Sequence, residues 1–315
     1  MALTITSSTY AGEFAGKYIA AALLSADTIE GGGITVKPNV KYKEVMKTLS
    51  TNALVKDAAC DFTDGSTVTL TERVLTPKEF QVNLQICRET LRSDWEAAEM
   101  GYSVFDTLPP SFADFVIGHI AAKVAQKTEE TIWQGDEDVV GGGEFDGFAT
   151  LFVASGSGVN SVTPTSGVTA VTAANVIQEM GLVVDAIPSG VYGKEDLYLY
   201  VSQNIARAYV RALGGFGANG LGANGVNNGG TTWYNGGDLA FDGVKLFVCS
   251  GLADNDMVAA QKSNLFFGTG LLSDHNEVKL IDMGDIDGSQ NVRIIMRFTS
   301  GVQFGIGSDI CYYTI

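Results

Sequence analysis

The feature that most constrains this chain is one long amphipathic stretch. Apolar residues recur every fourth position over Phe112–Ile132, while charged residues such as Glu129 lie off this stripe. That period predicts an α-helix. Ser111 is placed to cap its N-terminus, and Gly135 is a residue of the kind that ends helices. A helix over 111–134 would be ~36 Å long at ~1.5 Å per residue. The fold is therefore expected to contain a rod among otherwise short elements.

A second pattern predicts a β-ribbon. Residues 67–71 and residues 80–87 both alternate between apolar and polar side chains, which is the period of a strand with one apolar face. We expect the two strands to pair as a hairpin that turns near residues 76–79. The apolar face consists of Val68, Leu70, Phe80, Val82, Leu84 and Ile86. Because a lone two-stranded ribbon is marginally stable in water, this face is expected to rest on another chain or domain.

The rest of the chain mixes short helices and strands. Helices are predicted over 172–186 and 202–213, with a buried strand over 196–201 between them. Between 135 and 165 the chain is glycine-rich, and loops are expected on either side of residues 148–153. Further strands are predicted at 244–248, 265–268, 277–283, 292–298, 302–304 and 309–314. Helices interleaved with strands, followed by a run of strands, favour a mixed α+β architecture.

Composition and charge limit the possible functions. The chain has 315 residues, 45% of them hydrophobic and 18% charged, as a packed globular protein requires. Its net charge of −16 opposes tight binding to phosphate backbones, and we find no cluster of basic residues. No apolar run approaches the roughly 20 residues of a membrane span, and the N-terminus lacks a secretory pattern. We therefore expect no membrane partner and synthesis in a cytoplasm.

The residues most often used in catalysis and metal binding are scattered. The four cysteines, at 60, 87, 249 and 311, contain no C-x-x-C pair and are expected to be buried free thiols. His119 and His275 belong to no spaced metal motif. The sequence DMGDIDG at 282–288 does not fit the calcium-loop register. We therefore predict no catalytic residue, metal site or cofactor.

One glycine-rich stretch at 211–230, RALGGFGANGLGANGVNNGG, contains G-x-G-x-x-G at 215–220. A dinucleotide-binding loop needs a strand before it and a helix after it, so that the pyrophosphate meets a helix N-terminus. Here a predicted helix ends at Leu213, and no helical pattern follows before Thr231. A surface loop is the favoured interpretation. A nucleotide-dependent enzyme built on this loop remains the less favoured alternative.

Taken in order, these features resemble the major capsid proteins of tailed double-stranded DNA phages, the Hong Kong 97 type. The resemblance covers nearly the whole chain. The resemblance rests on five sequence segments: TVTLTERVLTPKEFQVNLQI, SFADFVIGHIAAKVAQKTEETIWQG, DLYLYVSQNIARAYVRAL, NLFFGTGLLSDHNEVKLIDM and VRIIMRFTSGVQFGIGSDICYY. It implies an N-terminal arm (1–60), an extended loop (61–95), a peripheral domain (96–170) with the spine helix 111–134, an axial domain with a mixed sheet (171–290), and strands that return to the peripheral domain (291–315).

The resemblance also implies a function. It implies a non-enzymatic subunit that self-assembles into hexamers and pentamers of an icosahedral virion head, built in the host cytoplasm around double-stranded DNA without sequence-specific contacts. Implied partners are a portal, a separate scaffolding protein and decoration proteins. The hairpin's apolar residues, with Lys78 near its tip, would contact a neighbouring subunit. The residues near the capsomer axis would be Gly215, Phe216, Asn219 and Leu221. An encapsulin-like shell of a cellular nanocompartment is the alternative.

Overall fold

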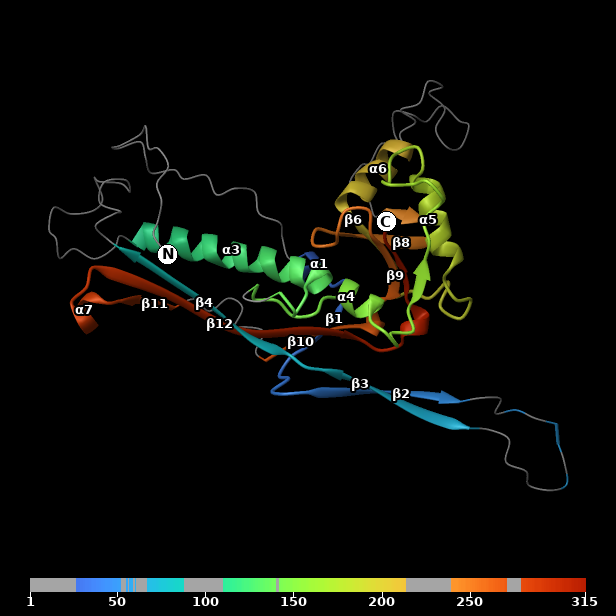
Figure 1. Cartoon of the computed structure of the whole chain (residues 1–315), viewed down its shortest axis with the longest axis horizontal. Coiled ribbons are helices and arrows are strands. Elements are labelled where there is room, and N and C mark those ends of the chain that lie inside the picture. The colour runs from blue at the N-terminus through green and yellow to red at the C-terminus, as the bar shows by residue number, and fades with distance from the viewer. Residues whose placement is uncertain are drawn as a thin grey trace.

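The structure is a computed structural model that describes residues 27–51, 55, 57–58, 60, 67–87, 110–139, 142–213, 239–270 and 279–315. Within these ranges helices and strands are mixed, as the α+β pattern predicts (Figure 1). The strands form three sheets, of five, six and two strands. None of the described helices combines the length and the apolar character that a membrane span requires.

The five-stranded sheet is organised around one long strand, β12 (Asn291–Phe304). On one side, β12 pairs antiparallel with β4 (Lys78–Cys87) over ten residue pairs. On its other side lie β11 (Lys279–Asp282) and β10 (Leu265–Thr269), and β1 (Thr35–Lys37) extends the sheet from β10. The separate strands predicted at 292–298 and 302–304 are therefore one continuous strand. A short helix, α7 (Gly284–Asp287), joins β11 to β12.

The predicted rod is present as α3 (Pro110–Gln134), which lies along the five-stranded sheet (Figure 1). Ser111 is inside the helix, so its assignment as the N-cap is wrong. The first helical residue is proline, whose fixed φ suits that position. The helix ends before Gly135, as predicted. A β-carbon at Gly135 would lie 2.2 Å from the carbonyl oxygen of Phe145, so this glycine permits a close approach of two backbone segments.

The six-stranded sheet stands at one end of α3 (Figure 1). Its strand order is β5 (Asn160–Val162), β13 (Cys311–Tyr313), β9 (Met257–Gln261), β6 (Leu197–Ser202), β8 (Val244–Cys249) and β7 (Ala240–Phe241). Helices α5 (Val176–Asp185) and α6 (Gln203–Leu213) pack against it around a buried aliphatic core. The predicted helices at 172–186 and 202–213 and the strand at 196–201 are confirmed.

A second core joins the two larger sheets. Large aromatic side chains meet there, and Trp133 of α3 lies 5.4 Å from both Phe148 and Tyr200 between ring centroids. Phe148 belongs to α4 (Phe148–Val153), a helix that lies between the two predicted loop segments and was not itself predicted. Shorter elements complete this body: α1 (Asp27–Glu30) and two 3₁₀ turns, Lys262–Asn264 and Gly307–Asp309.

The predicted hairpin between 67–71 and 80–87 is wrong in its pairing. β3 (Val68–Leu75) pairs with β2 (Glu44–Thr51), a strand that the sequence analysis does not predict, and β4 pairs with β12. The chain passes from one sheet to the other at residues 76–77. β12 can pair with all ten residues of β4, and Phe80 packs on the second core. Pairing with β12 thus gives β4 a longer hydrogen-bonded ladder than the predicted hairpin would, and it also buries apolar side chains of β4.

Candidate functional site

The β2–β3 ribbon projects away from the rest of the molecule (Figure 1). Its register places Val45 opposite Val74 and Leu49 opposite Leu70, and opposed residues of an antiparallel pair share one face. Leu49 is 64% exposed and Leu70 is 55% exposed. We name the exposed apolar residues of this face the ribbon stripe: Val45, Leu49, Val68, Leu70 and Val74. Of the predicted contact residues, Val68 and Leu70 thus lie uncovered by any described part of the chain.

An ion pair interrupts the ribbon stripe. The Lys47 Nζ and Glu72 Oε1 atoms lie 3.4 Å apart, between the two opposed apolar pairs. Both side chains are well exposed, so the pair adds little to the free energy of folding. Its position still matters, because a shift of one residue would move the apolar side chains to the other face. The pair therefore supports the register that creates the stripe.

At its root the ribbon is fixed to the body by buried contacts. Leu75 is fully buried against Gly268 of β10. The guanidinium of Arg73 lies 4.1 Å from the centroid of the Phe304 ring and donates a hydrogen bond of 2.5 Å to the Ser157 carbonyl oxygen. Burial lowers the pKa of Arg73. These contacts set the direction in which the ribbon leaves the body.

The remaining hairpin residues lie in a different place from the one predicted. Phe80 packs within its own chain, with its ring centroid 6.0 Å from that of Phe145 and 5.7 Å from that of Phe298. With Val82, it lines a cavity of about 190 Å³ beneath α3. Leu84 is half-buried and lies opposite Ile294 of β12. The expectation that this strand has no local cover is therefore wrong, since α3 and the loop after it cover it.

Lys78 is likewise not at a hairpin tip. It is the first residue of β4, next to the ribbon root, and its ammonium group forms an ion pair with Glu137 just after α3. This contact holds the loop that follows the rod against the start of β4. Whether Lys78 also meets a neighbouring subunit stays a prediction.

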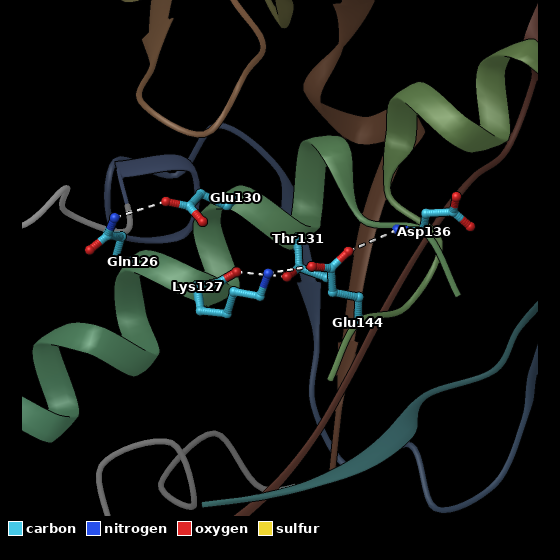
Figure 2. A network of polar contacts seen from close by, with 6 residues as sticks. All are labelled: Gln126, Lys127, Glu130, Thr131, Asp136 and Glu144. Atoms are coloured by element: carbon cyan, nitrogen blue, oxygen red, sulfur yellow. Dashed lines mark hydrogen bonds and ion pairs between the residues drawn. The ribbon is translucent and has the colours of Figure 1, made fainter. Parts of the chain in front are cut away.

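Figure 2 shows a polar network that holds the same loop against the end of α3. Glu144 forms an ion pair with Lys127 and accepts a hydrogen bond of 3.2 Å from the backbone N–H of Asp136. The hydrogen bond from Lys127 lowers the pKa of Glu144. On the helix, Gln126 donates to Glu130 over 2.8 Å. Across the described residues no group of three His, Cys, Asp or Glu side chains could hold a metal ion, and we interpret this network as structural.

The apolar period of the rod does not reveal a buried polar side chain near its end. Glu129 lies off the apolar stripe of the rod, yet its side chain is fully buried, as is Thr28 beside it. The available signal was Trp133, one helical turn further along, which marks a second apolar edge on the last turns of α3. The rest of the fold packs on two sides of the last turns of α3, whereas the apolar period of the helix predicts packing on one side.

Four predicted residues, Gly215, Phe216, Asn219 and Leu221, lie outside the described residues, as does all of 214–238. α6 ends at Leu213, where the sequence predicts a helix end. The capsomer-axis role of the glycine stretch stays a prediction. Of the cysteines, Cys249 and Cys311 are buried free thiols as expected, while Cys60 is exposed, so that expectation is wrong there.

Comparison with known proteins identifies the fold. The sequence matches no protein-family model and no curated protein. Solved structures match over nearly the whole chain. The capsid of a native GTA particle aligns with a TM-score of 0.63 at 13% identity, covering 99% of this chain and 94% of that one. The capsid of Myoviridae phage XM1 aligns with a TM-score of 0.59 at 13% identity, covering 99% of this chain and 94% of that one. A Gordonia phage Cozz structure aligns with a TM-score of 0.59 at 11% identity, covering 99% of this chain and 91% of that one.

The arrangement of rod, helix-backed mixed sheet and projecting ribbon is thus that of a capsid protein. In particular, the chain has the fold of tailed-phage major capsid proteins, the Hong Kong 97 type. This confirms the fold class predicted from the sequence. With identities of 11–13%, the similarity establishes the fold, and the function is inferred separately.

Proposed function

We propose that this chain is the major capsid protein of a tailed double-stranded DNA bacteriophage, a non-enzymatic subunit that self-assembles into the hexamers and pentamers of an icosahedral head. The observation that carries the proposal is the match to a capsid over 99% of the chain with a TM-score of 0.63. The exposed ribbon stripe adds to it, because an uncovered apolar face on a projecting element is typical of an interaction site.

In this proposal the β2–β3 ribbon, residues 44–75, is the extended loop, in place of the predicted 61–95. The ribbon stripe lies on a neighbouring subunit. Full transfer of such a side chain from water to a buried position contributes about 1.5–3 kcal/mol. Each of these five contributes less than that, because they are only 40–64% exposed in the subunit. A closed shell repeats the same contact for every copy, and the assembly is stable through that repetition.

The other parts of the chain take the roles that the fold suggests. Residues 110–139 and the β12 sheet form the peripheral domain, and the six-stranded sheet with α5 and α6 forms the axial domain. The stretch with Gly215, Phe216, Asn219 and Leu221 lies at the capsomer axis. The net charge of −16 allows the shell to enclose DNA without binding it tightly. Portal, scaffolding and decoration proteins are the further partners, and the virion is the location, after assembly in the host cytoplasm.

Electron microscopy of the expressed protein tests this function. We expect capsomers or megadalton particles from the natural sequence. Leu70→Asp places a charge in the ribbon stripe and should give a folded subunit that does not assemble. Thr69→Asp is the matched control, because it adds the same charge to the same strand on the opposite face, and it should assemble normally.

Two results would contradict the proposal. One is a natural-sequence protein that stays a monomer under all assembly conditions and with co-expressed scaffolding protein. The other is a set of particles from the native source that contain an enzyme cargo and no DNA, which would identify a nanocompartment shell.

A further inference from the structure

The segment 27–34 is held on the body at a buried carboxylate. Thr28 donates two hydrogen bonds to Glu129 of α3, one from its hydroxyl to Oε1 and one of 3.2 Å from its backbone N–H to Oε2. Trp133 Nε1 donates a hydrogen bond of 2.9 Å to the same Thr28 hydroxyl oxygen. All three side chains are fully buried or nearly so. Two segments about a hundred positions apart in sequence therefore meet at one polar contact in an apolar core.

Within the described part of the chain this carboxylate has no cationic partner. No Lys, Arg or His of the described residues forms an ion pair with Glu129. The titratable groups that face it are acidic: Asp27 on α1, and the buried thiol of Cys249 at the end of β8. Burial raises the pKa of Glu129 to about 7, the hydrogen bonds from Thr28 oppose the rise, and Asp27 adds to it. The group thus changes charge near neutral pH while segment 27–34 is docked.

Further contacts hold the segment independently of Glu129. Tyr200 donates its hydroxyl to the carbonyl oxygen of Gly33, and burial raises the pKa of Tyr200 well above its ordinary value. A β-carbon at Gly33 would lie 2.8 Å from Cζ of Phe247, so the backbone fits closely against that ring. Ile34 is buried. The contact between Thr28 and Glu129 differs from these, because it contains a carboxyl group whose pKa is about 7.

We propose that Glu129 is a proton-operated lock that holds segment 27–34 on the body when the carboxyl is protonated and loosens it when the proton leaves. The lock differs from the assembly contact: it lies inside one chain, on the opposite side of α3 from the solvated residues, and it acts in a single unassembled subunit. Its physical basis is that deprotonation leaves a buried negative charge beside Asp27. Release exposes that charge to water.

Hydrogen exchange of the unassembled full-length protein tests the lock. Protection of the backbone N–H groups of 28–34, corrected for the intrinsic pH dependence of exchange, should fall on the order of a hundredfold between pH 5 and pH 8, since the released carboxyl returns to its ordinary pKa. Glu129→Gln cannot titrate and should give a flat profile. Glu130→Gln is the matched control one residue along, and it should keep the natural profile.

A second variant separates the lock from a merely structural contact. Thr28→Val removes the hydroxyl hydrogen bond that lowers the pKa of Glu129, so the midpoint of the profile should move to higher pH. Protection that does not depend on pH in the natural sequence would overturn the proposal. So would an unchanged pH profile in Glu129→Gln. Neither result depends on whether the protein forms shells.

Discussion

The side chain of Leu75 fills the space that a side chain at Gly268 would need: a β-carbon at 268 would lie 2.6 Å from Leu75 Cδ2. Leu75 is the last residue of β3 and is fully buried, while Gly268 lies in β10, opposite Gly301 of β12. The ribbon is thus attached to the five-stranded sheet through a steric fit that depends on the absence of a side chain.

Replacing Gly268 with alanine should therefore destabilise the subunit. Overpacking of a buried site costs about 1–3 kcal/mol, and the strain falls on the ribbon root. Urea unfolding of the unassembled protein measures the change. Gly181→Ala is the matched control: Gly181 is inside α5 with no atom within 4 Å of a new β-carbon, so alanine should stabilise by about 0.5–1 kcal/mol. Equal effects of the two substitutions would refute the steric explanation.

Arg73 and Phe304 should be energetically coupled. A guanidinium over an aromatic ring contributes about 0.5–2 kcal/mol, and here the group also donates to the Ser157 carbonyl oxygen. A double-mutant cycle of Arg73→Ala and Phe304→Leu, followed by urea unfolding, should give a coupling free energy in that range. Simple additivity of the two changes would show that the stacking does not stabilise the root.

Tyr313→Phe should destabilise the six-stranded sheet and the helices packed on it. The Tyr313 hydroxyl donates a hydrogen bond of 2.8 Å to Oε2 of the buried Glu179. The other carboxylate oxygen of Glu179, Oε1, has no hydrogen-bond partner among the described residues. Loss of a donor from a buried carboxylate costs about 1–3 kcal/mol. Thermal or urea unfolding measures the loss. Tyr198→Phe is the control, since the ring of Tyr198 packs on its neighbours while its hydroxyl has no hydrogen bond to a described residue, and it should change stability by less than about 0.5 kcal/mol. A similar loss in both variants would contradict this role of Glu179.

The stability of the subunit should depend on pH through Glu129. Its pKa is about 7 in the folded chain, against an ordinary value of 4.5. The folded state therefore binds more protons between these values, and stability falls as the pH rises from about 4.5 to 7. The full change is about 3 kcal/mol. Urea unfolding at pH 5, 6, 7 and 8 measures it as the difference between the natural protein and Glu129→Gln. A difference that stays constant with pH would contradict the raised pKa.

The sequence was sufficient for the elements whose signals are local. α3 has an apolar period and is followed directly by Gly135, and its structural bounds agree with the prediction to within one residue. The partner of β4 could not be predicted, because its alternation reveals a strand but not the strand it pairs with. β2 was missed because Lys47 interrupts its apolar face, and only the pairing with Glu72 across the ribbon explains that lysine.

The same distinction holds for the candidate site. Val68 and Leu70 were predicted as contact residues from their alternation, and the structure leaves both exposed on the ribbon. Phe80 shows the same alternation, yet it is covered by its own chain. Burial of Glu129 depends on α1, which lies about a hundred positions earlier. Periodicity shows which face of an element is apolar, and tertiary packing decides what covers that face.

The position of β12 near the end of the chain has a consequence for synthesis. β4 ends at Cys87, and the strand that completes its ladder begins only at Asn291. At a translation rate of about 5–20 residues per second, β4 waits roughly 10–40 s for its partner. Any product that stops before β12 lacks the strand that joins β4, β10 and β11. A chain truncated before β12 therefore has no complete five-stranded sheet from which the ribbon can project.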